Sequence, residues 1–404
     1  MKTICLYFQI HQPVILRKYH FFDIGLRHDY FDAFANKSGI RELTEECYIP
    51  MNNLLLELIE KYGKRFKVSF SISGCALEQL AMHAPEVIES FQELAQTGCV
   101  EFIAETYGHS LASLSDTDEF AIQIKTHAKK MKELFGQRPK VVRNSSLIYS
   151  DSIGKQIADM GFKAMITDGA KHVLGWKSPN FIYSNAFEPQ LSLLLKNSQL
   201  SDDLSLRFSD RSWDEWPLTA EKYTRWLIQS TQDSDIVNIF MNYETFGHYQ
   251  KAESGIFDFF RALPEQILDT EEFRFLTPSE AVKENESRGI LSVPYPISWS
   301  DEEKDITGWL GNELQNEAFR ELYKIQPLVR KINDEALNHD FTYLQASDHF
   351  YYMRTNLFSD NRKQKYSSPY DSPYDAFINY MNVLSDFIRR VNERSKEKTT
   401  RKNK

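Results

Sequence analysis

The first 290 residues alternate between short apolar runs of strand length and longer stretches whose apolar residues recur at helical spacing. We predict strands at residues 3–10, 66–73, the first half of 100–111, 141–142, 162–167, 191–195, 236–241 and 273–276. We predict helices at residues 51–62, 85–97, 116–135, 152–160, 220–231, 256–268 and 278–287. This alternation favours a parallel sheet with right-handed crossovers, and seven or so repeats allow such a sheet to close into a barrel.

The alternation stops near residue 290. The segment 294–300, Pro-Tyr-Pro-Ile-Ser-Trp-Ser, indicates a domain boundary. Beyond it, residues 311–337 and 373–391 are long helical stretches without a strand pattern. We therefore predict an α/β chain with a barrel over residues 1–290, an α-helical C-terminal domain over 291–392 that completes the cleft, and a disordered basic tail over 393–404.

The charge and cysteine content restrict the classes of partner. A formal net charge of −9 argues against nucleic-acid binding, which requires a basic face. The four cysteines, Cys5, Cys47, Cys75 and Cys99, form no Cys-x-x-Cys pair and are expected to be buried free thiols in a reducing compartment. Residues 1–12 do not resemble a signal peptide, and no apolar run reaches membrane-spanning length. We therefore expect a cytoplasmic protein with neither a nucleic-acid nor a membrane partner.

Polar side chains follow several of the predicted strands. Glu105 is typical: it stands where a strand-like run changes abruptly to Gly-His-Ser. In an α/β barrel the residues at the carboxyl ends of different strands meet at one mouth, where barrel enzymes carry their chemistry. The residues that we expect at this mouth are His11, Glu78, Glu105, Asp168, Asn242 and Glu244, with His109, His172 and His248 close behind in the loops.

Several carboxyl groups in one pocket favour acid–base chemistry. Carboxylates that converge cannot all be comfortably ionised, so one is pushed toward its protonated form while another stays anionic. A proton donor beside a nucleophile is what cleavage of a glycosidic bond requires. The chain also holds 28 Phe, 20 Tyr and 6 Trp, whose rings either fill a core or stack on sugars.

Five separated segments resemble the motifs of glycoside hydrolase family 57, which includes α-amylases and 4-α-glucanotransferases. They are His11-Gln12-Pro13, Gly74-Cys75-Ala76-Leu77-Glu78, Glu105-Thr106-Tyr107-Gly108-His109-Ser110-Leu111, Thr167-Asp168-Gly169 and Tyr243-Glu244-Thr245-Phe246-Gly247. Each is weak alone, but the five occur in the right order at or just after strand ends. The likeness extends to Arg143-Asn144 and to residues 298–301, 309–312 and 347–350, which are most similar to the α-amylase-type members.

This resemblance implies a distorted, TIM-like (β/α)7 barrel followed by helices, and a double displacement that retains the anomeric configuration. Glu105 would be the nucleophile and Asp168 the general acid/base, with their carboxyl groups roughly 5 to 5.5 Å apart, as retaining enzymes require. The implied substrates are α-1,4-glucans such as starch, glycogen and maltooligosaccharides. No metal or other cofactor is implied, and the oligomeric state is not indicated.

The resemblance also assigns residues that bind the substrate. His11, Glu78 and Glu244 would bind or orient the sugar at the cleavage point. Asn242 stands where the family commonly has Asp, and losing that charge would weaken a contact to the sugar or alter the protonation of Asp168. The candidates for stacking on neighbouring glucose units are Trp213, Trp299 and Trp309. For Trp299 and Trp309, packing between the barrel and the helices is an equally good interpretation.

Three other functions stay open at this point. The first is transfer rather than hydrolysis, as in a 4-α-glucanotransferase or branching enzyme of the same family. The second is a metal-dependent carbohydrate deacetylase or a mannosidase-like hydrolase, with Glu244 and His248 four residues apart and His11, Asp168 and His172 as further ligands. No His-x-His or His-x-x-x-His pair supports that site. The third is a catalytically weak protein that binds glucans without cutting them.

Overall fold

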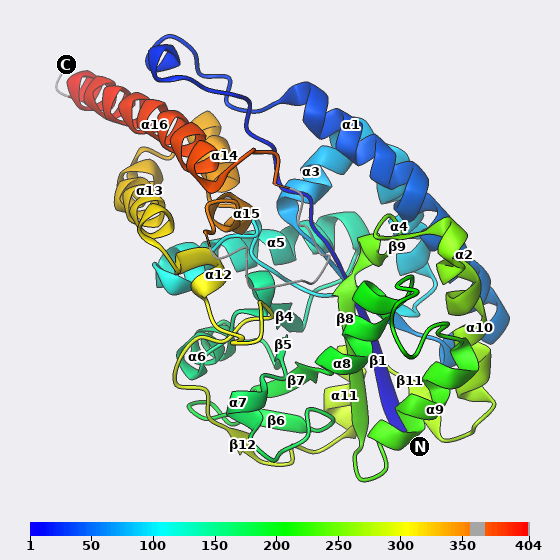
Figure 1. The fold of residues 1–404 in the computed structure, drawn as a ribbon. Coiled ribbons are helices and arrows are strands. Elements are labelled where there is room, and N and C mark those ends of the chain that lie inside the picture. The colour runs from blue at the N-terminus through cyan, green and yellow to red at the C-terminus, as the bar shows by residue number, and fades with distance from the viewer. Residues whose placement is uncertain (356–367, 403–404) are drawn as a thin grey trace.

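Parallel strands follow one another in a circuit in the computed structural model, which describes residues 1–355 and 368–402 (Figure 1). Within these ranges the strands of the circuit are, in spatial order, β1 (Lys2–Ile10), β2 (Val68–Ile72), β3 (Val100–Phe102), β4 (Val141–Arg143), β5 (Ala164–Asp168), β7 (Ser192–Lys196) and β8 (Ile236–Asn242). All of them were predicted from the sequence, and the α/β class is confirmed.

Two sheets make up this circuit and are joined at both seams. At the first seam Ala104, just past β3, forms a parallel bridge with Val142 of β4. At the second seam the backbone N–H of Asn197 donates to the carbonyl of Asn238 in β8 over 2.9 Å. β8 then pairs in parallel with β1 along nearly its whole length. The pairing therefore returns to its starting strand, as a closed barrel of seven strands requires.

The regularity is broken at two places. β11 (Phe273–Phe275) pairs with residues 2–4 of β1, whereas β2 pairs with residues 7–10, so the two strands share one edge of β1. β6 (Ile182–Asn185) runs antiparallel to β7 and carries β12 (Ile290–Leu291) on its outer edge. β6 and β12 were not predicted from the sequence.

Helices cover the outside of the circuit (Figure 1). The predicted helices correspond to α2 (Ile49–Tyr62), α4 (Pro85–Gln96), α5 (Thr117–Phe135), α6 (Asp151–Asp159), α9 (Ala220–Ser230), α10 (Ile256–Leu268) and α11 (Pro278–Glu284). Glu78 lies on a short further helix, α3 (Gly74–His83), and α1 (Ala33–Leu43) was not predicted. The boundaries follow local chemistry: Asp116 caps α5 by accepting from the N–H of Glu119, and Gly136 ends it at φ +70°.

The two faces of each strand belong to different cores. On β1, alternate side chains such as Ile4 and Phe8 pack with the outer helices. The side chains between them, Cys5 and Tyr7, pack with inward-facing residues of the other strands. Because side chains on a strand alternate with a period of two, the residues that reach the mouth of the circuit can be read directly from this inner core.

Beyond residue 300, the described part of the chain is helical. Its elements are α12 (Thr307–Leu310), α13 (Glu313–Ile332), α14 (Glu335–Leu344), α15 (Ser347–Tyr351) and α16 (Pro373–Lys402). The predicted stretch 311–337 is interrupted at Asn333, which adopts φ +49°. Residues 393–402, expected to be disordered, continue α16, while 403–404 lie outside the described residues. Within the described ranges, no helix combines the length and the apolar character that crossing a bilayer demands.

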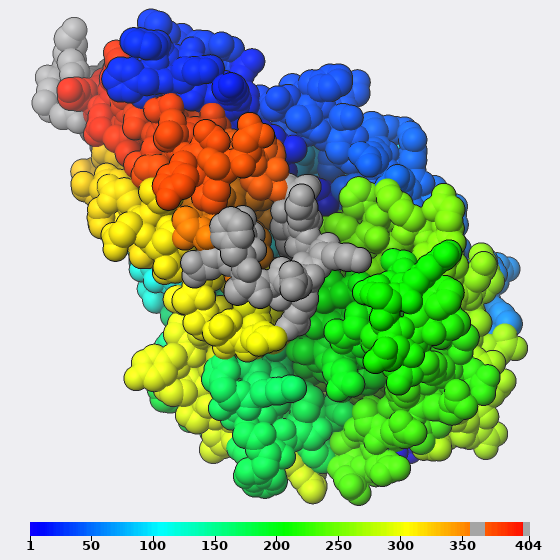
Figure 2. All heavy atoms as spheres, viewed as in Figure 1, coloured from blue at the N-terminus to red at the C-terminus, as the bar shows by residue number. Residues whose placement is uncertain are grey.

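The segment that follows β1 packs on these C-terminal helices. The backbone N–H of Tyr19 donates to Asn379 of α16 over 2.7 Å, and that of Gly25 donates to Asp386 over 2.6 Å. In Figure 2 the blue N-terminal segment accordingly lies against the red end of the chain. The segment that follows β1 therefore lies against α16, near the other end of the described chain.

A buried ion pair ties α13 to the barrel helix α5. The Arg330 guanidinium donates to both carboxylate oxygens of Glu119, over 2.5 and 2.7 Å, and Glu119 is fully buried. We expect Arg330→Met to lower the free energy of unfolding by about 3 kcal/mol, because it leaves a buried carboxylate without its counter-charge. Chemical denaturation measures this loss. The control Arg225→Met breaks an exposed pair with Glu221 and should leave the midpoint unchanged; equal losses in the two variants would contradict the assignment.

Candidate active site

At the ends of three strands, the apolar inner core is followed by buried polar side chains. The inner-core residues concerned are Ile103, Val141 and Ile166. Two positions further along the same strands or just beyond them stand Glu105, Arg143 and Asp168, all buried. Since side chains two residues apart share a face, all three side chains lie on the inward side at the carboxyl ends of β3, β4 and β5. Arg143 occupies the strand between the two acids.

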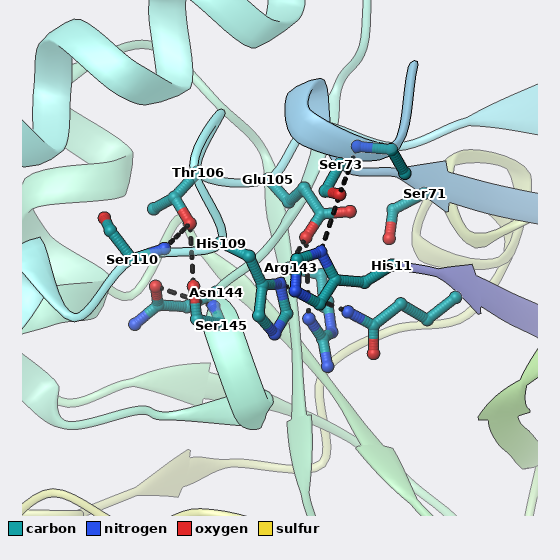
Figure 3. Close-up of polar contacts among 12 residues, drawn as sticks. His11, Ser71, Ser73, Glu105, Thr106, His109, Ser110, Arg143, Asn144 and Ser145 are labelled. Atoms are coloured by element: carbon teal, nitrogen blue, oxygen red, sulfur yellow. Dashed lines mark hydrogen bonds and ion pairs between the residues drawn. The ribbon is translucent and has the colours of Figure 1, made fainter. Parts of the chain in front are cut away.

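Glu105 is fully buried and held from several sides (Figure 3). Its Oε2 accepts from His109 Nδ1 over 3.0 Å and lies 3.6 Å from Nη1 of Arg143. Its backbone N–H donates to His127 Nδ1 over 3.2 Å, and His127 Nε2 in turn donates to the Ile72 carbonyl. Its second carboxylate oxygen, Oε1, has no protein hydrogen-bond partner. The carboxylate is therefore fixed by one oxygen and has the other available for a ligand.

Arg143 gives this buried carboxylate a counter-charge. Its side chain is buried, and its Nε and Nη1 make no hydrogen bond to the protein. A guanidinium does not lose its proton in proteins, so the charge beside Glu105 is permanent. Buried donors without partners are rare in folded proteins and are often satisfied by a ligand or water. Arg143 was not predicted as a site residue, although its position at the end of a predicted strand was a usable signal.

His11 and His109 form a stacked pair over Glu105 (Figure 3). Their ring centroids are 3.9 Å apart with the planes inclined by 19°. His11 uses both nitrogens, Nδ1 to Ser73 Oγ over 2.7 Å and Nε2 to Asp348 over 2.8 Å. Burial opposes ionisation of Asp348, but the charge and hydrogen bond of His11 dominate and hold its pKa well below the usual range. Asp348, from α15, was quoted only within a motif and was not predicted as a site residue.

The pKa of His109 is lowered, although an acid lies beside it. Burial, together with the neighbouring His11 and Arg143 charges, holds it well below its ordinary value. The imidazole is therefore neutral at pH 7, and its hydrogen bond to Glu105 needs the proton on Nδ1. His109 adopts φ +51°, a conformation that non-glycine residues rarely take and that turns this side chain back toward the strand end.

Asp168 lies in a different electrostatic environment. It is buried, and it accepts from Ser198 Oγ over 3.2 Å and from Lys304 Nζ over 3.3 Å. Burial raises the pKa of Asp168 even though Lys304 and Lys196 act to lower it. Lys196 forms an ion pair with Asp202, in which Nζ lies 3.0 Å from Oδ1. Burial therefore makes the carboxyl group of Asp168 more readily protonated than that of an exposed aspartate.

Glu244 and Asn242 lie on the opposite side of the circuit, at the end of β8. Asn242 is paired with Gln9 of β1. Glu244 is buried, and its Oε1 accepts from Tyr48 over 2.7 Å and from Gln12 over 3.2 Å. Burial raises the pKa of Glu244, and the hydrogen bond from Tyr48 opposes that rise. The structure thus brings Glu244 to the segment that follows His11.

Glu78 faces the C-terminal helices. It accepts from Tyr107 over 2.6 Å and from Tyr343 of α14, and it lies 3.5 Å from His339 Nε2. Burial acts to raise its pKa, but the hydrogen bonds from His339 and the two tyrosines outweigh burial and lower it. Glu78 therefore connects α3 to α14, which is a different environment from that of Glu105.

His339 makes this connection sensitive to pH. Hydrogen bonds to Asp340 and Glu78 raise its pKa from 6.5 to about 9. A histidine with a raised folded-state pKa stabilises the fold fully below pH 6.5, and that stabilisation is lost as the pH rises through about 9. We expect His339→Gln to reduce the fall in unfolding free energy across this range, as measured by denaturation at several pH values. A fall as steep as in the wild type would contradict it.

The three tryptophans have unequal exposure. Trp309 is only 2% exposed and packs against Trp299 and Tyr351, with ring centroids 6.2 and 5.7 Å away. It therefore has no ring face for a sugar in this structure, and packing is the interpretation that fits it. Trp299 is partly buried and donates its backbone N–H to Ser146. Trp213 packs against Trp226 and lies under the guanidinium of Arg207.

One group of possible metal ligands lies near Glu105. Atoms of His11, His109 and Asp348 lie within 4.8 Å of one another. An imidazole binds a metal in the plane of its ring at about 2.1 Å. Rings stacked at 3.9 Å with planes only 19° apart cannot both hold one ion in their planes. The geometry therefore fits a hydrogen-bonding pair better than a metal site, and among the described residues Asp168, His172 and Glu244 belong to no such group.

Comparisons with known proteins agree with this architecture. A family model described as "Glycosyl hydrolase family 57" matches residues 5–294. A Methanocaldococcus jannaschii protein named "Putative alpha-amylase" is 41% identical over 396 residues, which cover 94% of this chain and 83% of that protein.

Two solved structures share the fold. The 4-alpha-glucanotransferase from Thermococcus litoralis superposes with a TM-score of 0.66 at 15% identity, covering 86% of this chain and 56% of its own. This chain thus spans little more than half the length of that enzyme. A GH57-type branching enzyme from Pyrococcus horikoshii superposes with a TM-score of 0.65 at 14% identity, covering 98% of this chain and 94% of its own. At such identities the likeness establishes the fold alone.

Proposed function

The chain belongs to glycoside hydrolase family 57, and from this membership we propose that it hydrolyses α-1,4-glucans with retention of anomeric configuration. The name of the M. jannaschii relative supports an α-amylase-like activity. The observation that carries the proposal is the pair of buried acids, Glu105 and Asp168, on the inward faces of β3 and β5. The seven-strand circuit is, in this proposal, the distorted (β/α)7 barrel of the family.

The two acids have the environments that their proposed roles need. Glu105, beside the permanent charge of Arg143, acts as the nucleophile: it attacks the anomeric carbon and forms a glycosyl-enzyme. Asp168, whose pKa burial raises, donates its proton to the departing glycosidic oxygen. Asp168 then takes a proton from the water that releases the sugar from Glu105, which restores both groups.

The spacing of the strands is compatible with this pairing. Neighbouring strands lie about 4.8 Å apart, so the backbones of β3 and β5, two strands apart, are separated by about 10 Å. Glu105 and Asp168 both lie on the inward side of their strands, with Arg143 on the strand between them. This geometry supports carboxyl groups close enough for direct attack in the first step.

Polar groups around the acids are suited to sugar hydroxyls. We assign Asn242 and Glu244, at and just beyond the end of β8, to hydroxyls of the sugar at the cleavage point. His11, just beyond the end of β1, lines the same position, but its two ring nitrogens are already bonded to Ser73 and Asp348. The orphaned Glu105 Oε1 and Arg143 Nε are further partners for hydroxyls there. Glu78 acts from one step further away, through Tyr107 and Tyr343.

Incubating the protein with maltoheptaose and following the product lengths by chromatography tests the proposal. Shorter sugars alone support hydrolysis. Longer sugars appearing as well support transfer, so that the chain would be a glucanotransferase or branching enzyme of the family. An unchanged substrate after long incubation contradicts the enzyme and favours a glucan-binding protein.

A metal-dependent carbohydrate hydrolase is the second candidate, favoured only by the proximity of His11, His109 and Asp348. Elemental analysis of the purified protein separates the two candidates. Stoichiometric zinc together with activity abolished by a chelator would replace the double displacement by metal chemistry. Activity that survives the chelator supports the carboxylate mechanism.

A further inference from the structure

A lysine from the far side of the domain boundary reaches the carboxylate of Asp168. Lys304 lies 136 residues further along the chain, and its Nζ is 3.3 Å from Asp168 Oδ2. The same Nζ donates to the carbonyl of Trp299 over 3.0 Å. The side chain of Lys304 is 17% exposed and that of Asp168 fully buried. The lysine therefore closes one side of the Asp168 environment.

The loop that presents this lysine is closely held. The backbone N–H of Ser298 donates to the Lys304 carbonyl over 2.9 Å, and that of Lys304 donates to Ser300 over 3.1 Å. Asp301, in the same loop, pairs with Arg354 over 2.8 Å. Asp301 and Lys304 adopt φ values of +57° and +52°, which cost energy for residues other than glycine. Such strain persists only where the surroundings fix it, so the loop holds Lys304 in this position.

The other charged groups facing Asp168 cannot take over this contact. Lys196 is buried near Asp168, but its own hydrogen-bonded ion pair is with Asp202, whose negative charge opposes its effect. Ser198 donates a neutral hydroxyl to the carboxylate. Lys304 is thus the cation that is hydrogen-bonded to Asp168 itself.

We propose that Lys304 is a positioning residue of the reaction, which orients the Asp168 carboxyl group and balances its protonated and ionised forms between the two steps. This inference rests on the proposed function. Asp168 must give up a proton in the first step and accept one in the second, and such a group works best when neither form is strongly favoured. Burial favours the protonated form, and the ammonium group of Lys304 favours the carboxylate.

The test compares Lys304→Met with Lys304→Arg. In Lys304→Met the titration midpoint of Asp168 should rise by about one pH unit, because the cation that stabilises the carboxylate is gone. The midpoint is followed by infrared spectroscopy of the carboxyl band, assigned with Asp168→Asn. The alkaline limb of kcat/KM on maltoheptaose should rise by the same amount. Lys304→Arg keeps the charge and should retain the wild-type midpoint, and Lys171→Met, on the exposed surface nearby, should leave it unchanged.

The outcomes separate the two proposals. A midpoint that does not move in Lys304→Met, or that moves equally in Lys304→Arg, overturns the role of Lys304. If the midpoint rises in Lys304→Met but the wild type cleaves no glucan, the proposed function alone is overturned. Thermal unfolding checks that each variant is folded, and Lys304→Gln replaces Lys304→Met if the latter is not.

Discussion

The Glu105→Gln variant is expected to cleave maltoheptaose with a kcat about 10⁴-fold below that of the wild type. An amide is a poor nucleophile, so no glycosyl-enzyme forms and the double displacement stops at its first step. The replacement has nearly the same shape, and the amide oxygen can still accept from His109 Nδ1. The loss therefore reflects chemistry rather than a collapsed site. Steady-state kinetics, with affinity measured separately by calorimetry, distinguishes an inactive enzyme that still binds from a protein that never cleaved.

A matched control comes from the same strand. Glu101 is four residues earlier on β3, is also buried, and accepts from the backbone N–H of Ser279 over 2.9 Å, in the first turn of α11. Glu101→Gln makes the same chemical change away from the mouth and should keep the wild-type turnover. If Glu105→Gln retained turnover within tenfold of this control, another residue would have to be the nucleophile.

The position of each strand, and the side chains that it points inward, could be predicted from the sequence because both follow from local rules. Apolar runs fix where each strand lies, and the period of two fixes which side chains point inward. Glu105 and Asp168 could therefore be assigned to one mouth without coordinates. The rule was less informative for Glu78, because the helix that begins at Gly74 carries its side chain to Tyr107 and Tyr343.

The contacts made by the C-terminal part could not be predicted. Asp348 reaches His11 across 337 residues, and Lys304 reaches Asp168 across 136 residues. No local pattern indicates which distant loop packs over a strand end, since tertiary contacts decide it. The same holds for Trp309, whose burial depends on the helices around it.

The basic end of the chain illustrates how composition can mislead. Few apolar residues and many charges predicted disorder over 393–404. In the structure Arg394 pairs with Asp334 over 2.9 Å, and Lys398 donates to the Ile332 carbonyl over 2.5 Å. These contacts stabilise the last turns of α16 against α13 and α14. A charged segment can remain helical where a neighbouring helix supplies both a counter-charge and free carbonyl groups at its end.

Replacing Asp168 by asparagine should lower kcat/KM on maltoheptaose by about 10³-fold, because the departing sugar oxygen no longer receives a proton. A glycosyl fluoride needs no such proton, since fluoride is a stable leaving group. We therefore expect the loss of kcat/KM on α-maltosyl fluoride to be much smaller, about tenfold or less. The comparison of the two substrates isolates proton donation from general damage to the site.

The second step, in which water releases the sugar from the glycosyl-enzyme, tests the role of Asp168 independently. Without a base, water attacks the glycosyl-enzyme slowly, whereas azide is a nucleophile that has no proton to lose. Azide should therefore accelerate turnover of the fluoride by Asp168→Asn and yield a glycosyl azide of retained configuration. Asp159→Asn, an exposed change on α6, is the control and should behave as the wild type. If Asp168→Asn lost equal activity on both substrates and did not respond to azide, the proton would have to come from another group, and Asp168 would hold the sugar instead.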